Sequence, residues 1–254
     1  MWSCPRSRST LIARSFGQLE GGIVYDEPLY APYLVQNGFD HPQREAVLAS
    51  RETDYDRAIS LLVGDLPDGA SFSFQKHISK HFRSNQEREW LKYLSHFFLI
   101  RHPQEIIHSY QKICDQVTEA DIGFESLFDI FKTVESFLGK PPLVVDANDL
   151  VRNPRLYLER ICLELGIPFS ETMLSWDVGL SGMEDRSHNP FPWLWTGELP
   201  MTNWYSQVNR TTGFVFPKET LKIELPPSLI PVCEACLPFY EKLSQYRLRI
   251  DNAV

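Results

Sequence analysis

The residues best suited to chemistry lie near the N-terminus, where arginines alternate with hydroxyl side chains over residues 5–10. We predict that this segment joins a strand to a helix. At such a junction the first helical N–H groups have no intrahelical partner and the helix dipole is positive, so the junction binds anions. Arginine's planar guanidinium suits a pair of phosphate or sulfate oxygens. The candidate ligands are Arg6, Ser7, Arg8, Ser9 and Thr10.

This loop differs from the one that ATP-dependent phosphotransferases use. The pattern GxxxxGK[ST] is absent, and no glycine lies between Met1 and Phe16. Without glycine we expect the backbone to lack easy access to positive φ, which disfavours a kinase that uses Mg-ATP. A P-loop phosphotransferase is therefore a minor alternative. The structural alternative is that Ser7 or Ser9 caps the helix while the arginines face solvent.

A second anion-binding pair is predicted where an apolar run ends. Residues 97–100 are continuously apolar and stop at Arg101, as a buried parallel strand with a functional C-terminal edge does. The helix that is expected to begin at Pro103 carries Ser109 two turns beyond the strand, so Arg101 and Ser109 can face one pocket. Two anion sites at adjacent strand ends are what 3′-phosphoadenosine 5′-phosphosulfate requires of a protein.

Strands alternate with helices, which predicts βαβ units and an α/β fold: a single domain with a central parallel sheet flanked by helices. In such sheets ligands bind at the C-terminal ends of the strands. The expected strands end at Cys4 or span residues 23–25, 71–74, 97–100 and 143–145. The expected helices run from the first loop to Gly17 and lie within residues 29–63, 103–114, 149–165 and 227–249.

Composition limits the class of protein and of partner. A length of 254 residues fits one domain over 1–254, in which the aromatic-rich residues 188–216 are expected to cover the substrate. The net charge of −8 argues against nucleic acid or another polyanion as a partner. Neither a long apolar run nor a signal peptide is visible, so we expect no membrane span and a cytoplasmic location. The oligomeric state is not indicated.

The number and spacing of the cysteines also favour a cytoplasmic location. Five scattered cysteines predict reduced thiols, not a disulfide framework. Cys233 and Cys236 form a CxxC inside a helical pattern, but no second pair completes a zinc site, so we expect both to be buried packing residues. No cluster of metal-ligating residues is visible, and we expect no metal.

These motifs together resemble the sulfotransferase superfamily over nearly the whole chain. Residues 5–10 look like the family's 5′-phosphosulfate loop, and Arg101 with Ser109 looks like its 3′-phosphate site. Supporting matches are the "EDL…DP", "LG" and "STGF" patterns at residues 146–154, 165–167 and 211–214. Residues 2–7, 26–31 and 76–78 are also similar to sulfotransferase-like proteins described beside branched-chain aminotransferases in plants.

The resemblance implies an enzyme that uses 3′-phosphoadenosine 5′-phosphosulfate as co-substrate and a small hydroxyl-bearing acceptor. Three positions depart from the family pattern. The cytosolic enzymes carry Lys in place of Arg6, Arg8 replaces a common glycine, and the late "RKG" motif is absent, with Arg210 as a candidate for the same phosphate. A non-catalytic nucleotide-binding module on the same fold is the alternative that these departures keep open.

Sulfonate transfer needs charge stabilisation on the leaving phosphate and removal of the acceptor's proton. We assign the first task to Arg6. For the second, Glu27 resembles the position of a catalytic glutamate in some bacterial sulfotransferases, whereas His77 follows the strand where the cytosolic enzymes place a catalytic histidine; both stay open. The histidines expected to be structural are His81, His102 and His108.

Aromatic residues of segment 188–216 are candidates for the wall of an acceptor pocket, because they combine apolar area with polar tips. An apolar or aromatic acceptor, neutral or cationic, is expected from them and from the acidic net charge. A dimer contact is the alternative use. The residues concerned are Phe191, Trp193, Trp195, Trp204 and Tyr205.

Overall fold

Short apolar runs form parallel strands, and amphipathic stretches between them form helices. The computed structural model describes residues 1–38, 44–82, 87–114, 116–179, 189–191, 208–215 and 223–250. The chain divides into two units, each assembled from separate stretches. The first unit comprises Met1–Ser9, Ser95–Phe169 and Phe214–Val254, and the second comprises Thr10–Leu94 and Ser170–Gly213.

The first unit is built on three parallel strands, β1 (Trp2–Ser3), β4 (Phe97–Ile100) and β5 (Leu143–Asp146). Strand β4 lies in the middle and pairs with β1 on one side and β5 on the other, in register through Phe98. All of β4 is buried, as its continuous apolar run predicts. The last segment of the unit adds to the sheet, since the Leu248 N–H donates to the Val144 carbonyl oxygen (2.7 Å).

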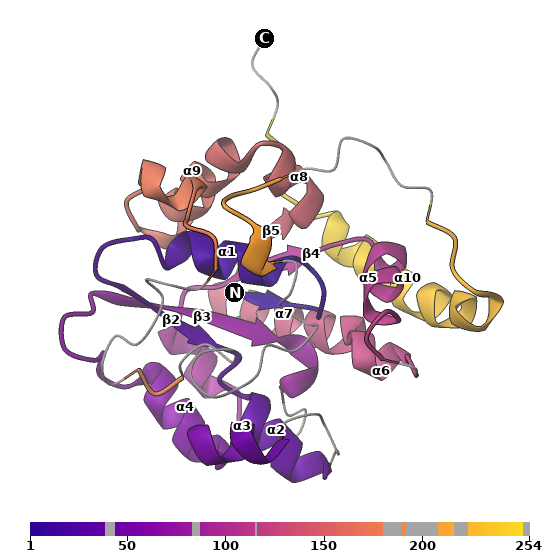
Figure 1. Cartoon of the computed structure of the whole chain (residues 1–254), viewed down its shortest axis with the longest axis horizontal. Helices are drawn as coiled ribbons and strands as arrows, with labels where there is room; N and C mark the ends of the chain where they lie inside the picture. The colour runs from indigo at the N-terminus through magenta and orange to yellow at the C-terminus, as the bar shows by residue number, and fades with distance from the viewer. Residues whose placement is uncertain are drawn as a thin grey trace. The chain divides into compact units, whose positions relative to one another are not determined.

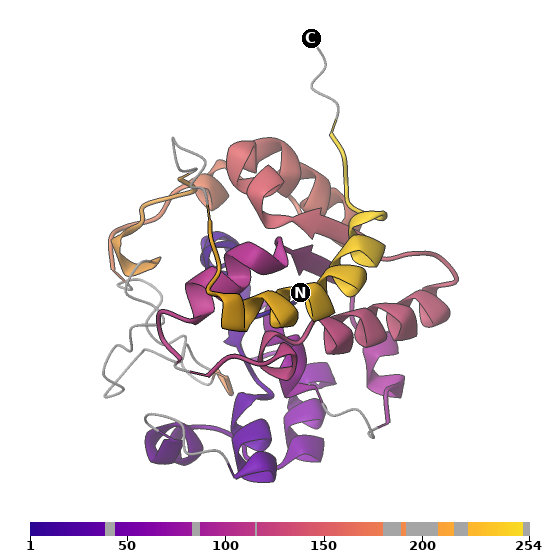
Figure 2. The ribbon, with the colours of Figure 1, turned by 90° about the vertical axis from the view of Figure 1, so that its right-hand side faces the viewer.

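Helices cover this sheet. The C-terminal helix α10 packs against α5, α6 and α7 (Figures 1 and 2). Its most buried residues are Cys233, Cys236 and Leu243, so the CxxC thiols serve as packing residues, and burial raises the pKa of Cys236 to about 12. The helices of this unit are α5 (Pro103–Tyr110), α6 (Glu119–Ile122), α7 (Phe124–Leu138), α8 (Ala147–Arg152), α9 (Pro154–Leu165) and α10 (Ile230–Ser244).

The second unit contains the parallel pair β2 (Gly22–Asp26) and β3 (Phe72–Ile78), in register from Gly22 with Phe72 to Asp26 with Lys76. A Cβ at Gly22 would lie 2.6 Å from Cζ of Phe72, so a larger residue here would require the Phe72 ring to shift. The helices are α1 (Ser9–Phe16), α2 (Tyr30–Asn37), α3 (Arg44–Ser50) and α4 (Tyr55–Val63); α3 and α4 both pack against α2 (Figure 1).

A buried arginine organises the rest of this unit. The Arg14 guanidinium on α1 donates to the carbonyl oxygens of Asp177, Gly179 and Val208 at 2.8, 2.6 and 2.8 Å. It also lies over the Trp176 ring, 5.2 Å from the centroid. These bonds to main-chain acceptors hold the segments on either side of residues 180–207 to α1.

The predicted fold class is confirmed, with parallel strands, flanking helices and a strand–loop–helix at the N-terminus. The single helix predicted over 149–165 is wrong in one respect: it is two helices, because Pro154 cannot continue a helix and Asn153 before it adopts φ −133°. Helices α6 and α7 were not predicted. None of the described helices is long and apolar enough to cross a membrane.

The aromatic segment is only partly described. Trp193, Trp195, Trp204 and Tyr205 lie outside the described residues, so their predicted role in an acceptor pocket is untested. Phe191 is fully buried and packs edge-to-face on Tyr25, with ring centroids 5.4 Å apart. Its place in the structure is therefore in the core of the second unit.

The centre of β4 should be sensitive to truncation. Phe98 is fully buried and packs edge-to-face on Phe131 at 5.3 Å. We expect Phe98→Ala to lower the free energy of unfolding by about 3–5 kcal/mol, because it leaves a cavity between strand and helix. Leu138→Ala, at a position 48% exposed, is the control and should cost less than about 1 kcal/mol. Equal effects of the two variants in urea titrations would contradict this assignment of the core.

Candidate functional site

The loop after β1 has an unusual backbone. Arg6 and Arg8 adopt φ of 60° and 65°, on either side of Ser7, which does not. Alternation between positive and negative φ is the pattern by which successive N–H groups of an anion-binding nest face one side, so these φ values are compatible with the predicted anion site. The expectation that a loop without glycine lacks positive φ is therefore wrong. Two arginines take that conformation, at a cost of about 1–2 kcal/mol each, and Arg8 does so where the family commonly has glycine.

The loop's hydroxyl groups differ in their surroundings. Ser7 is fully buried, and its Oγ donates to the Cys4 carbonyl oxygen, so this hydroxyl closes the turn. Ser9 is buried where α1 begins, and Thr10 is half-buried. A role for these three as ligands stays a prediction.

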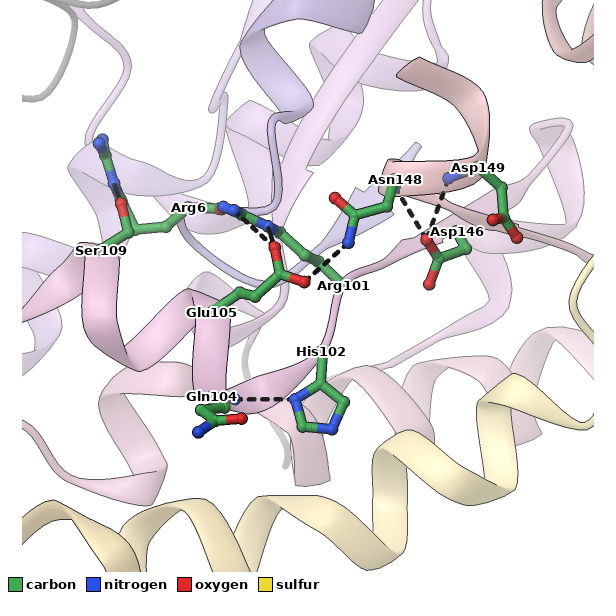
Figure 3. Close-up of polar contacts among 9 residues, drawn as sticks. All are labelled: Arg6, Arg101, His102, Gln104, Glu105, Ser109, Asp146, Asn148 and Asp149. Atoms are coloured by element: carbon green, nitrogen blue, oxygen red, sulfur yellow. Dashed lines mark hydrogen bonds and ion pairs between the residues drawn. The ribbon is translucent and has the colours of Figure 1, made fainter. Parts of the chain in front are cut away.

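The two predicted anion-binding groups meet in the first unit (Figure 3). Arg6 Nε donates to Ser109 Oγ at 3.0 Å, and Arg101 Nη1 donates to the Arg6 carbonyl oxygen at 2.9 Å. Arg6 after β1, Arg101 after β4 and Ser109 on α5 are therefore in direct contact and form one cluster. His102, expected to be structural, accepts the Gln104 N–H on Nδ1 at 3.3 Å and caps α5.

Two further residues belong to this cluster and were not predicted. Glu105 Oε2 accepts from Arg101 Nε and Nη2, each at 2.8 Å, and its Oε1 accepts from Asn148 Nδ2 at 2.7 Å (Figure 3). The spacing of Arg101 and Glu105, four residues apart, is typical of a helical ion pair and was the available signal. Nothing in the sequence pairs Glu105 with Asn148, because that contact joins two different strand ends.

The cluster is electropositive. Burial, and next the charge of Arg101, lower the pKa of Arg8 to about 10, although Glu105 and Asp146 partly offset this. Arg8 stays protonated at pH 7, is half-buried, and makes no hydrogen bond or ion pair with the part of the chain that the structure describes. Burial and then the charges of Lys112 and Arg101 also lower the pKa of His108. An anion bound here would compensate charges that protein groups leave only partly paired.

The second unit holds a buried group of ionisable residues at the ends of β2 and β3. Lys76 Nζ donates to Asp26 Oδ1 at 2.7 Å and to Glu27 Oε1 at 2.8 Å. The side chains of Lys76 and Asp26 are 1% and 0% exposed, and that of Glu27 is 14% exposed. Burial by itself would lower the pKa of Lys76, but the two carboxylates outweigh it and raise that pKa.

Glu27 is the third non-glycine residue with positive φ, at 48°, among those that the structure describes. Its N–H donates to the Lys76 carbonyl oxygen (2.9 Å), and its own carbonyl oxygen accepts from the Tyr30 N–H (3.0 Å). Its Oε2 lies 3.9 Å from Nδ1 of His81, whose ring stacks on Tyr30 at 4.9 Å. Glu27 is thus held in a strained conformation by contacts on both sides.

His77 lies deeper in this unit. It is 3% exposed, its Nε2 is 3.2 Å from Gln75 Oε1, and its ring centroid is 6.3 Å from that of Trp90. The structure therefore places His81 near Glu27 and places His77 beside core residues. Across the described ranges no group of three or more His, Cys, Asp or Glu side chains is arranged to hold a metal ion.

Comparisons with known proteins agree with this architecture. A family model described as the sulfotransferase domain matches residues 1–246. Two curated Arabidopsis thaliana proteins are similar: Branched-chain-amino-acid aminotransferase-like protein 2 (33% identity over 244 residues) and protein 1 (34% over 246). The alignments cover 95% and 96% of this chain but 40% and 41% of those proteins, so the chain spans about two fifths of their length.

Two solved structures share the fold. They are the Sulfotransferase Domain from the Curacin Biosynthetic Pathway (TM-score 0.55, 15% identity) and the Sulfotransferase Domain from the Synechococcus PCC 7002 Olefin Synthase (0.53, 18%). Both superpositions include 98% of this chain. They include 97% of the Curacin pathway domain and 94% of the Olefin Synthase domain. At these identities the likeness establishes the fold, whereas the family model adds a match in sequence. The chain belongs to the sulfotransferase domain family.

Proposed function

We propose that this protein transfers the sulfonate group of 3′-phosphoadenosine 5′-phosphosulfate to a hydroxyl of a small apolar or aromatic acceptor. The observation that carries the proposal is the cluster of Arg6, Arg101 and Ser109, in a loop where Arg6 and Arg8 adopt positive φ. Membership of the sulfotransferase domain family supports the reaction type. The curated relatives are named for an aminotransferase-like protein, which names no donor or acceptor.

The residues present fit a donor with two anionic groups. The loop at residues 6–8 and the N-terminus of α1 supply main-chain N–H groups for the phosphosulfate end. Arg101 and Ser109 supply charged and hydroxyl donors for the 3′-phosphate. Arg8 is the further cation available to either group, since it is half-buried and without an ion pair in the described stretches.

In the proposed reaction the acceptor oxygen bonds to sulfur while the bond from sulfur to the bridging phosphate oxygen breaks. Negative charge passes to the released phosphate, and Arg6 with the helix N-terminus stabilises it. Arginine stays protonated, so Arg6 supplies charge and not a proton. The acceptor's proton must go to a base.

We assign that base to Glu27. Its carboxylate is the part of the buried ionic group that reaches the surface, and the strained φ of Glu27 is a conformation that proteins retain mainly where function requires it. His77, as the other candidate, is enclosed beside Gln75 and Trp90. Free cysteines and an acidic net charge support a cytoplasmic location and a small-molecule acceptor.

Removal of Arg101 tests the donor assignment. We expect Arg101→Ala to raise the Kd for adenosine 3′,5′-bisphosphate roughly 10- to 100-fold, because a charged hydrogen-bond donor to phosphate is lost. Calorimetric titration measures this, and Arg160→Ala, an exposed arginine on α9, is the control. Unchanged affinity would contradict the donor site. Preference of the wild-type protein for Mg-ATP would favour a phosphotransferase.

Paired substitutions test the base. We expect Glu27→Gln to lower the rate of sulfonate transfer to 2-naphthol or benzyl alcohol about 10²- to 10⁴-fold, with donor affinity unchanged. His77→Ala should lower it less than about tenfold. The reverse order would move the assignment to His77, and full activity of both variants would rule out both. Donor binding without turnover across a wide panel of alcohols and phenols would favour a non-catalytic module.

The ion pairs of Lys76 make a prediction for stability. Lys76→Met leaves two buried carboxylates without their counter-charge and should lower the free energy of unfolding by about 3–5 kcal/mol at pH 7. Asp26→Asn/Lys76→Met removes one charge of each sign and should recover roughly half of this loss.

The pH dependence follows from the raised pKa of Lys76. The stabilisation is complete below the unfolded pKa of about 10.4 and is lost as pH rises through the higher folded pKa. The stability gap between the wild-type protein and the double variant should therefore narrow in urea titrations above about pH 10.5. A constant gap up to about pH 11.5 would contradict the ion pairing.

A further inference from the structure

Glu105 uses both carboxylate oxygens within the arginine cluster. Its Oε2 faces Arg101, with Nε and Nη2 each at 2.8 Å, and its Oε1 accepts from Asn148 Nδ2 at 2.7 Å (Figure 3). The side chain is 24% exposed, so this pairing is only partly screened by water. A carboxylate with both oxygens engaged has little freedom to rotate, and it fixes the plane of the guanidinium that it binds.

Asn148, which binds the second oxygen of Glu105, is itself held in place. Asp146 ends β5 and caps α8, with its Oδ1 accepting the N–H groups of Asn148 (2.8 Å) and Asp149 (3.3 Å). This cap sets the backbone position of Asn148, and the Asn148 amide then contacts Glu105. A chain of hydrogen bonds therefore runs from the end of β5 through α5 to the end of β4 and the carbonyl oxygen of Arg6.

These contacts decide which donors Arg101 has left. A guanidinium carries five N–H groups. Nε and one N–H of Nη2 bind Glu105, and one N–H of Nη1 binds the Arg6 carbonyl oxygen. Among the residues that the structure describes, these contacts leave one N–H on each terminal nitrogen, which is enough to donate to two oxygens of one phosphate.

We propose that Glu105, held by Asn148, is a positioning residue for the 3′-phosphate of the donor: it locks Arg101 so that its two terminal nitrogens are presented to the phosphate. This inference rests on the proposed function. It gives Glu105 and Asn148 a role in donor binding, although neither residue is proposed to touch the donor. It explains why an acidic side chain lies inside a cluster of cations that is proposed to bind an anion.

Positioning and simple electrostatics predict opposite results, which makes the proposal testable. Removing a negative charge beside an anion site should tighten anion binding if charge alone mattered. If Glu105 positions Arg101, its removal should weaken binding, and only for a nucleotide that carries the 3′-phosphate.

The experiment compares adenosine 3′,5′-bisphosphate with adenosine 5′-phosphate by calorimetric titration of the full chain. Glu105→Ala should raise the Kd for the bisphosphate about tenfold and leave that for the monophosphate within about twofold. Glu105→Gln, which keeps an acceptor for Arg101, should give a smaller loss of about threefold. The control is Glu125→Ala, an exposed acidic residue in the first turn of α7, which should change neither Kd.

Asn148→Ala provides a second route, because it frees Glu105 without changing any charge. It should weaken bisphosphate binding about threefold to tenfold, and it carries the test if Glu105→Ala does not fold. Unchanged or tighter bisphosphate binding in the folded Glu105 or Asn148 variants would overturn the proposal, as would an equal loss for both nucleotides. If the wild-type protein does not prefer the bisphosphate, the proposed donor is wrong and the role of Glu105 falls with it.

Discussion

The hydrogen bond from Arg101 to the carbonyl oxygen of Arg6 (2.9 Å) is the contact on which the arginine cluster, our proposed donor site, depends. It ties the end of β4 to the loop after β1, so the two segments that are proposed to bind the donor are held together. A guanidinium withdrawn from water must be paired and hydrogen-bonded, or it is costly to bury. Glu105 provides the charge, and Asn148 and Asp146 hold Glu105 in place.

The second unit also contains buried charges that need a partner, but there the groups in excess are carboxylates. Two carboxylates, Asp26 and Glu27, are compensated by one buried ammonium, Lys76. Compensation is asymmetric, because Asp26 is fully enclosed while the Glu27 side chain is partly exposed. A fixed carboxylate with one side open can accept a proton from a ligand without reorganisation of its surroundings. This is the physical basis for the assignment of Glu27 as the base.

Backbone strain occurs at three of the residues proposed to function in catalysis or donor binding. Arg6, Arg8 and Glu27 are the non-glycine residues with positive φ in the described part of the chain, and the sequence predicts a functional role for all three. Each such residue costs about 1–2 kcal/mol and persists only where its surroundings fix it. Glycine would relieve the strain at each position but would remove the side chain. The structure thus retains the charged groups at the expense of local stability.

Local signals in the sequence were sufficient for much of this account. The apolar run of β4, the arginine after it and the mixture of arginine and hydroxyl residues near the N-terminus indicate where two strands end and which residues follow them. What could not be predicted depends on contacts between distant segments. Asn148 meets Glu105 only because β4 and β5 are neighbours, and Lys76 meets Glu27 only because β2 and β3 pair in register.

The environment of individual side chains could not be predicted from the sequence either. His77 and His81 are indistinguishable by type and almost adjacent in sequence, yet His81 lies near Glu27 and His77 beside Trp90. Which way each ring turns depends on the end of β3 and the short helical turn at Ser79–His81 that follows it. Arg8 is a further case, since a pattern that commonly contains glycine gave no indication that arginine could adopt the same φ.

The most direct test of the central claim is a crystal structure with adenosine 3′,5′-bisphosphate bound. The account predicts the 3′-phosphate within hydrogen-bonding distance of the Arg101 guanidinium and Ser109 Oγ, and the 5′-phosphate at the main-chain N–H groups of residues 6–10. A nucleotide bound elsewhere, or bound with Arg101 still directed only to Glu105 and the Arg6 carbonyl oxygen, would contradict it.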